Sequence, residues 1–279
     1  MRGRSLPSPV DVGLLLAGLI VAVVVWWLVA VRIPNGGDSW AYWAAPYSDP
    51  YDWARPYALL PYLYSPAFLQ AIAPLKLLPW DVFRGVWVAI LIASVFLMTP
   101  RAAAVVLLLP PVLFELEVGN IHLLLALACV VGLRHPAAWA FVLLTKVSPG
   151  VGLLWFAVRR EWRSLAVALG ATMAVAAASF VLAPSAWLGW LGVFDHPSDG
   201  AGTIPVPLVV RLPLAAVLVA WGARSDRRWT VPVAATLALP LLWVNGLAML
   251  VAVIPLIEWR RTLERFPFAG PLAGRMGPA

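Results

Sequence analysis

Lys146 is the residue of this sequence whose position most requires an explanation. It lies within the apolar run Ala137–Val158, where burying a charge costs about 2.5–3.5 kcal/mol on membrane-insertion scales. The proline and glycine at 149–150 indicate a helix that is broken beside it. An ammonium group at such a break would suit a phosphate held in a cavity. The structural alternative is an ion pair with Glu115 or Glu117.

Asp38 is the second candidate, because it follows the first apolar run by a few residues and lies in a polar, aromatic loop. Its structural alternative is an N-cap, since Asp is favoured there and the following residues suit a short interfacial helix. The aromatic side chains of the loop either form a membrane-interface belt or line a sugar site. They are Trp40, Tyr42, Trp43, Tyr47, Tyr51, Trp53 and Tyr57.

A third group of polar residues, Glu115, Glu117, Asn120 and His122, surrounds Gly119 where one apolar run ends and the next begins. They form either an ordinary interfacial turn or part of a site, because Asn120 and His122 enter the second run directly. Two carboxylates and a single histidine at this spacing match no recognised metal-ligand pattern. We therefore predict no metal site and no cofactor.

The composition places these residues in a membrane protein. Of the 279 residues, 62% are hydrophobic and 12% charged, whereas soluble domains carry about 45–50% apolar and 25% charged residues. One crossing needs roughly 20 residues, so the length allows about ten helices and no large soluble domain. The net charge of +7 comes from 18 Arg and only two Lys. These arginines flank apolar runs and set topology, so we predict membrane lipids as partners and no nucleic acid.

We predict an all-α fold, a polytopic membrane bundle of about ten helices, some short or broken. The last apolar run is too long for one crossing, and Pro240 and the Asn245–Gly246 pair predict a helical hairpin turning near Trp243–Gly246. The whole chain forms one membrane domain with six parts. They are an N-terminal anchor helix at 1–31, a first extracytoplasmic loop at 32–61, core helices at 62–183, a second extracytoplasmic loop at 184–205, C-terminal helices at 206–259 and a basic tail at 260–279.

The orientation follows from the basic residues. With Arg2 and Arg4 in the cytoplasm, strict alternation of crossings places the densest basic clusters on the same side. These clusters are Arg84, 159–163, 224–228 and 260–265. The segment 102–158 instead allows re-entrant or half-length helices, because it contains prolines and charged residues.

In their order, these features resemble glycosyltransferase family 87, which belongs to the GT-C superfamily of membrane glycosyltransferases. The resemblance covers Asp38 to Arg163. The chain is shorter than usual for the family, has Ser65 in place of a proline, and has Asn245 near a position where a histidine is common. The stretches that carry the resemblance are 38–45, 49–51, 62–66, 74–79, 119–124, 146–149 and 159–163.

The resemblance implies an inverting glycosyltransferase, a mannosyltransferase, that uses a polyprenyl-phosphate-sugar donor and a glycolipid or polysaccharide acceptor. Such enzymes place a catalytic Asp in the first extracytoplasmic loop, which is the position of Asp38. Lys146 would bind the donor phosphate. An abundance of Arg, Ala, Pro and Gly suits a GC-rich genome and hence a bacterial plasma membrane. The position of Asp38 in the first extracytoplasmic loop implies an active site that faces outward. The remaining predicted substrate-binding residues are Tyr42, Asp49, Tyr51, Tyr64, Asn120 and Asn245.

Two other functions fit part of the pattern. A chain without catalytic activity would move or bind a polyprenyl-phosphate lipid, as a carrier, flippase or assembly subunit, and Lys146 would serve it equally well. A solute transporter with a charge near the midplane is the third possibility, but no inverted repeat favours it. Asp38 distinguishes a glycosyltransferase from a lipid carrier, because a carrier needs no carboxylate at the start of the first loop.

Overall fold

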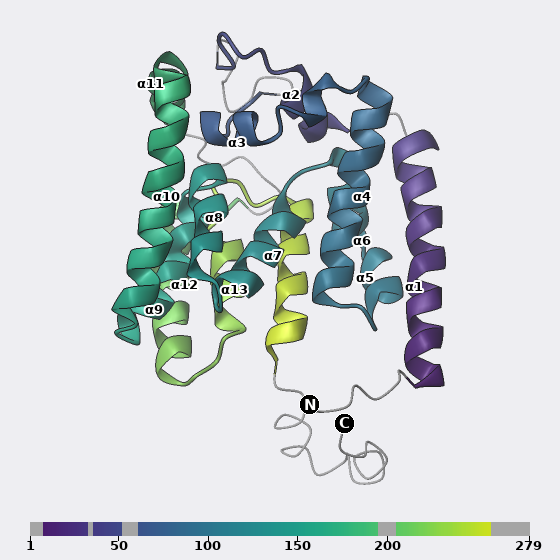
Figure 1. Cartoon of the computed structure of the whole chain (residues 1–279). Helices are drawn as coiled ribbons and strands as arrows, with labels where there is room; N and C mark the ends of the chain where they lie inside the picture. Colours follow the sequence, from purple (N-terminus) through teal and green to yellow (C-terminus); the bar gives the residue numbers. More distant parts are fainter. Residues whose placement is uncertain (1–7, 33–35, 52–60, 195–204, 258–279) are drawn as a thin grey trace, which may run out of the picture.

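The computed structural model describes residues 8–32, 36–51, 61–194 and 205–257, and most of these residues are helical (Figure 1). No strand occurs within them, so the predicted all-α fold is confirmed. The predicted basic tail at 260–279 lies outside the described residues.

Three helices of the described chain are long and apolar enough to cross a membrane. They are α1 with its π-helical end (Pro9–Arg32), α4 (Trp80–Met98) and α10 (Trp162–Leu182). A fourth span is possible if α6 (Pro110–Val118) and α7 (His122–Gly132) are counted together, although they meet at a bend of 111°. Fewer helices therefore reach full span length than the roughly ten that hydropathy predicted.

The central part of the chain consists of short helices, which is the alternative that its prolines and charges allowed. Pro110, Pro136 and Pro149 each lie in the first turn of a new segment, where the missing N–H costs nothing. The segments are α5 (Ala103–Leu107), the 3₁₀ segments η3 (Pro136–Ala138) and η4 (Ser148–Leu153), α8 (Trp139–Thr145) and α9 (Leu154–Val158).

The apolar run Tyr62–Leu78 does not form the predicted crossing. It contains α3 (Pro66–Ala71) and the single 3₁₀ turn η2 (Leu75–Leu77). The run ends beside α2 (Gly37–Ala44), where the indole Nε1 of Trp43 donates to the carbonyl of Leu78 at 2.9 Å. Hydropathy missed this because a proline-broken apolar segment can be covered by protein instead of spanning the bilayer.

Strict alternation of crossings predicted Arg84 at the same end of the molecule as the start of α1. Because the run Tyr62–Leu78 does not cross, Arg84 lies at the other end. Its guanidinium donates to the carbonyl of Val29 at 2.5 Å, near the end of α1 that leads to α2. The beginning of α1 lies at the other end, where Asp11 pairs with Arg101. Figure 1 shows α2 and α3 at the top and the start of α1 at the bottom.

The segment 184–205, predicted to be a loop, includes the helix α11 (Pro184–Val193). It begins at a proline directly after α10 and stays at the α2 end of the molecule, since Trp190 Nε1 donates to the carbonyl of Leu63 at 3.2 Å. Both predicted loops thus carry a helix at this end (Figure 1).

The C-terminal region forms α12 (Leu208–Arg224), α13 (Thr230–Leu237) and the 3₁₀ helix η5 (Val244–Leu256). The predicted hairpin is present, with its break at 238–243, just before the predicted turn. Arg211 holds this break by donating to the carbonyls of Leu237 at 2.5 Å and Leu239 at 2.8 Å.

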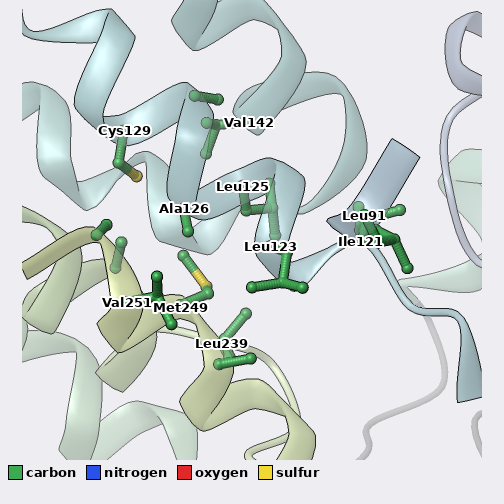
Figure 2. Packing of buried hydrophobic residues seen from close by; sticks show 14 of the residues in the cluster. Leu91, Ile121, Leu123, Leu125, Ala126, Cys129, Val142, Leu239, Met249 and Val251 are labelled. Atoms are coloured by element: carbon green, nitrogen blue, oxygen red, sulfur yellow. The ribbon is translucent and has the colours of Figure 1, made fainter. Parts of the chain in front are cut away.

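The core packs α7 directly against η5. Figure 2 shows Leu123, Ala126 and Leu239 around Met249, and all four side chains are fully buried. This packing brings the first residues of α7 close to the first residues of η5, and both carry polar side chains.

Candidate active site

Asn120 lies at the centre of a hydrogen-bonded group of side chains from distant parts of the chain. Its Nδ2 donates to Asp38 Oδ2 at 2.6 Å, and its Oδ1 accepts from Lys146 Nζ at 3.4 Å and from the hydroxyl of Tyr64 at 3.2 Å. The backbone N–H of Ile121 also donates to Oδ1, at 2.7 Å, which fixes the orientation of the amide. The structure thus brings together Asp38, Asn120, Lys146 and Tyr64. We call the polar cluster these four residues together with Tyr42, Glu115, His122 and Asn245.

Gly119 makes this arrangement possible at the bend between α6 and α7. Its φ of +70° is in the left-handed region that favours glycine, and a Cβ would lie 2.5 Å from Ser39 Oγ. Its carbonyl accepts a hydrogen bond from Trp87 Nε1 at 2.8 Å. The bend therefore places Glu115 on one arm and His122 on the other, facing each other.

We expect Gly119→Ala to destabilise the protein by about 2–4 kcal/mol, which combines the left-handed backbone cost with overpacking against Ser39. Thermal unfolding of the protein in detergent measures this loss. Gly170→Ala is the matched control, because a Cβ there meets nothing within 4 Å. Equal stability of the two variants would contradict the proposed role of the bend.

Lys146 has an extended backbone conformation and lies between α8 and η4, at the helix break that the sequence predicted. Its Nζ is 2.8 Å from His122 Nε2 and 5.8 Å from the centre of the Tyr64 ring. Among the described residues it forms no ion pair with a carboxylate, so the structural alternative, a pair with Glu115 or Glu117, is not found. Two of its three N–H donors have acceptors in the polar cluster, and the third is available for a ligand.

Glu115 orients His122 from the side opposite Lys146. Its Oε2 is 2.8 Å from His122 Nδ1, and its Oε1 accepts from the His122 backbone N–H at 2.5 Å. A carboxylate at Nδ1 favours the tautomer with the proton on that nitrogen, so that Nε2 is an acceptor for the Lys146 ammonium. Asn245 Nδ2 donates to Glu115 Oε2, the oxygen that faces His122 Nδ1, at 3.0 Å. Lys146 is therefore positioned through a chain that includes a buried carboxylate.

Asp38 is the second residue of α2, and Gly36, with φ of +105°, occupies the N-cap position. The N-cap alternative for Asp38 is therefore wrong. Burial raises the pKa of the Asp38 carboxyl above its usual range, while the hydrogen bond from Asn120 and the charge of Lys146 oppose this rise. Asp38 and Lys146 are half-buried, whereas Asn120, His122 and Glu115 are buried. The carboxylate and the ammonium are thus the accessible charged groups of the polar cluster.

Two tyrosines of the first loop, Tyr42 and Tyr51, belong to the core instead of a membrane-interface belt, whereas Tyr47 is exposed. Tyr42 donates its hydroxyl to that of Tyr64 at 2.9 Å, and both side chains are buried. Tyr51 supports them by donating to the backbone carbonyl of Tyr64 at 2.6 Å. Asp49 is exposed and accepts from the Tyr51 backbone N–H at 3.2 Å, so the structure places it outside the polar cluster. Trp53 and Tyr57 lie outside the described residues.

Lys76 has a positioning role that the sequence did not indicate. Its Nζ donates to the carbonyls of Tyr42 at 3.0 Å and Ala45 at 2.5 Å, and lies 4.8 Å from the Tyr47 ring centre. It therefore holds the C-terminal end of α2, the helix that carries Asp38.

If the transfer reaction implied by the family resemblance takes place here, we expect Lys76→Met to reduce it while leaving binding of the donor largely unchanged. The physical reason is that α2 loses the cation at its carboxyl end, which is worth about 0.3–1 kcal/mol even at an exposed site. A fall in kcat larger than the rise in KM for the donor checks this prediction, and an unchanged kcat would contradict it.

The sequence left Glu115 and His122 open between an interfacial turn and a site, and their burial in the polar cluster shows that they do not form an exposed turn. The sequence analysis did not single out Arg211, which holds the break between α13 and η5. The signal that identified Lys146, a charge within an apolar run, also applies to Arg211. In the part of the chain that the structure describes, no group of three or more His, Cys, Asp or Glu side chains is arranged to hold a metal ion.

Comparison with known protein families identifies this chain. The model of glycosyltransferase family 87 matches residues 62–269, which is 208 of the 279 residues. No curated protein and no solved structure matches the chain. The match includes Lys146, Asn120 and Asn245 but begins after Asp38, so the resemblance of the first loop to the family is a separate observation. With three quarters of its length matched, the chain belongs to glycosyltransferase family 87, and glycosyl transfer is the activity that this family implies.

Proposed function

We propose that this protein is an inverting GT-C-type mannosyltransferase that uses a polyprenyl-phosphate-mannose donor and a lipid or polysaccharide acceptor. One observation carries the proposal: the amide of Asn120 holds the Asp38 carboxylate at one end and the Lys146 ammonium at the other. A base and a phosphate-binding cation are thereby fixed at either side of one half-buried position.

The reaction is a single displacement at the anomeric carbon. The acceptor oxygen attacks that carbon while Asp38 takes the proton of the acceptor hydroxyl. The bond between the carbon and the donor phosphate oxygen breaks, and the phosphate leaves with its electron pair. Negative charge grows on this phosphate, and the third N–H of Lys146 stabilises it. No acid is required for a leaving group that is already stable as an anion.

The other members of the polar cluster position these two groups. His122, oriented by Glu115 and Asn245, aims the Lys146 ammonium. Tyr42, Tyr64 and Asn120 form the wall between the two charges, and their hydroxyl and amide groups are suited to sugar hydroxyls. Tyr51 supports Tyr64 from behind.

The distribution of arginines supports an extracytoplasmic active site in a bacterial plasma membrane. At the end of the molecule opposite α2, Arg101 pairs with Asp11 at the start of α1, Arg159 contacts Ala223 and Asp226, and one cavity is lined by Arg134, Arg227 and Arg228. Figure 1 shows the start of α1 and the turn between α12 and α13 at this end. Such an excess of arginine favours the cytoplasmic side. Asp38, at the other end of α1, would then face outward.

Sugar transfer by the purified protein in nanodiscs tests the proposal. Radiolabelled polyprenyl-phosphate mannose is incubated with a total lipid extract, and the anomeric configuration of the labelled product is determined. We expect transfer with inversion. Donor that binds but is never consumed would overturn the enzymatic proposal and favour a lipid carrier.

The raised pKa of Asp38 predicts the pH dependence of this reaction. A general base acts only when it is deprotonated, so kcat/KM falls as the pH drops through the pKa of Asp38 in the free enzyme. Because burial raises that pKa, the fall begins at a higher pH than for an exposed aspartate. A rate that is unchanged down to the usual range of aspartate would contradict this assignment.

A further inference from the structure

A partly polar cavity lies at the end of the molecule opposite the polar cluster. Its volume is about 690 Å³, and it is formed where the end of α7, the turn between α12 and α13 and the end of η5 meet. Figure 1 shows this turn and the end of η5 at the bottom, with α2 at the top. The cavity is therefore separate from the site around Asp38.

One part of the cavity wall is basic. Arg134, Arg227 and Arg228 line it, together with a single carboxylate, Asp226. That carboxylate already accepts from Arg159 at 3.0 Å, so its charge is compensated from outside the lining. The wall thus keeps an excess of positive charge.

Two of these arginines, Arg134 and Arg228, are available to bind a ligand. Arg227 is the exception, because its guanidinium is stacked over the Trp221 ring at 5.0 Å. The side chains of Arg134 and Arg228 are exposed and have no hydrogen-bond or ion-pair partner within the described residues. Arginine binds phosphate oxygens through paired N–H donors, so two arginines in one cavity suit a phosphate group.

Most of the rest of the wall is apolar, and His135, Ser225 and Trp229 complete it. The apolar part is formed by Val130, Val131 and Leu133 on one side and by Pro255, Leu256 and Ile257 on the other. A free phosphate ion would gain nothing from these side chains, whereas the glycerol and upper acyl carbons of a phospholipid would pack against them. Basic pockets between membrane helices near the bilayer surface are a recurring type of site for anionic lipid headgroups.

From this combination we propose that the cavity binds an anionic phospholipid, with its headgroup phosphate between Arg134 and Arg228 and its glycerol region against the apolar wall. The bound lipid would tie α7 to η5 and to the α12–α13 turn at the membrane surface. This site is independent of the sugar donor, and its existence does not depend on the proposed transfer reaction.

Native mass spectrometry of the full-length protein, released from nanodiscs of defined composition, tests the site. The nanodiscs contain phosphatidylglycerol and phosphatidylcholine in equal amounts. We expect selective retention of phosphatidylglycerol by the wild type. For Arg134→Gln/Arg228→Gln we expect retention to weaken about 30-fold, because each arginine near the surface contributes about fivefold. The matched control is Arg160→Gln/Arg163→Gln, which removes the same charge from exposed positions outside the cavity lining.

Three results would overturn the proposal. The first is an equal loss of retention in both double variants, which would indicate unspecific surface attraction. The second is no preference between the two lipids. The third is full displacement of the lipid by millimolar inorganic phosphate or glycerol phosphate. Sugar transfer is measured in the same samples. Loss of lipid retention with transfer intact supports the cavity as a separate site, so a failure of the proposed transfer reaction leaves this test unaffected.

Discussion

Asp38→Asn is expected to lower kcat for sugar transfer by about 10²–10⁴-fold, the usual contribution of a general base. Asparagine has the same shape and still accepts the hydrogen bond that Asn120 Nδ2 donates to this position. The fold of the polar cluster and the affinity for the donor should therefore be retained, while the acceptor hydroxyl loses its proton acceptor. Initial rates at saturating donor, with donor binding measured separately, check the prediction.

The chain offers a matched control for this variant in Asp81→Asn. Asp81 is the second residue of α4, as Asp38 is of α2, and both helices begin at the same end of the molecule. Asp81 is exposed and lies outside the polar cluster. We expect its variant to transfer sugar at the wild-type rate. An equal loss in both variants would assign the effect to the charge at a helix N-terminus, and full activity of Asp38→Asn would remove the proposed base.

Lys146→Met is the second change with a large expected effect. It removes the ammonium that would stabilise the leaving phosphate, and we expect kcat/KM for the donor to fall about 10²–10³-fold, as when one transition-state donor is removed. Lys146→Arg keeps the charge but changes its shape and reach. It should therefore recover part of the activity. Steady-state kinetics with varied donor concentration distinguish the two variants.

A binding measurement distinguishes a phosphate-binding role of Lys146 from a purely structural one. Polyprenyl phosphate, the product of the proposed reaction, should inhibit the wild type and bind much more weakly to Lys146→Met. The neutral polyprenol should bind equally to both proteins, because it lacks the charge that the ammonium recognises. Equal weakening for both lipids would mean that the variant disturbs the apolar part of the site, and the assignment of Lys146 to the phosphate would be wrong.

The sequence predicted the type of protein and the two charged groups of the site. Composition alone places the chain in a membrane, and the conservative expectation of an all-helical fold is confirmed. Lys146 is recognisable because a charge within an apolar run carries a large free-energy cost. The break beside it is recognisable because proline and glycine end helices for local steric reasons. These properties depend on neighbouring residues and are readable in order along the chain.

The topology of the first half was predicted incorrectly. Hydropathy treats Tyr62–Leu78 as a crossing because it counts apolar residues, but it does not distinguish burial against protein from contact with lipid. In the structure Phe68 and Leu69 of this run are buried within the protein. The run returns to α2, and Arg84 therefore lies near the start of α2, where a Cβ on Gly36 would be 3.3 Å from its Nε, instead of at the opposite face.

What the tertiary structure decided is which polar residues meet. Asn120 contacts Asp38 across 82 positions of the sequence, and Asn245 contacts Glu115 across 130. No local periodicity encodes such pairs, because they depend on the bend at Gly119 and on the packing of α7 against η5. The sequence by itself therefore determined a membrane-embedded helical protein with an unexplained lysine and a carboxylate after its first helix. Only the fold placed these two charges on one asparagine, because hydrogen bonds between distant residues form only once the helices that carry them are packed together.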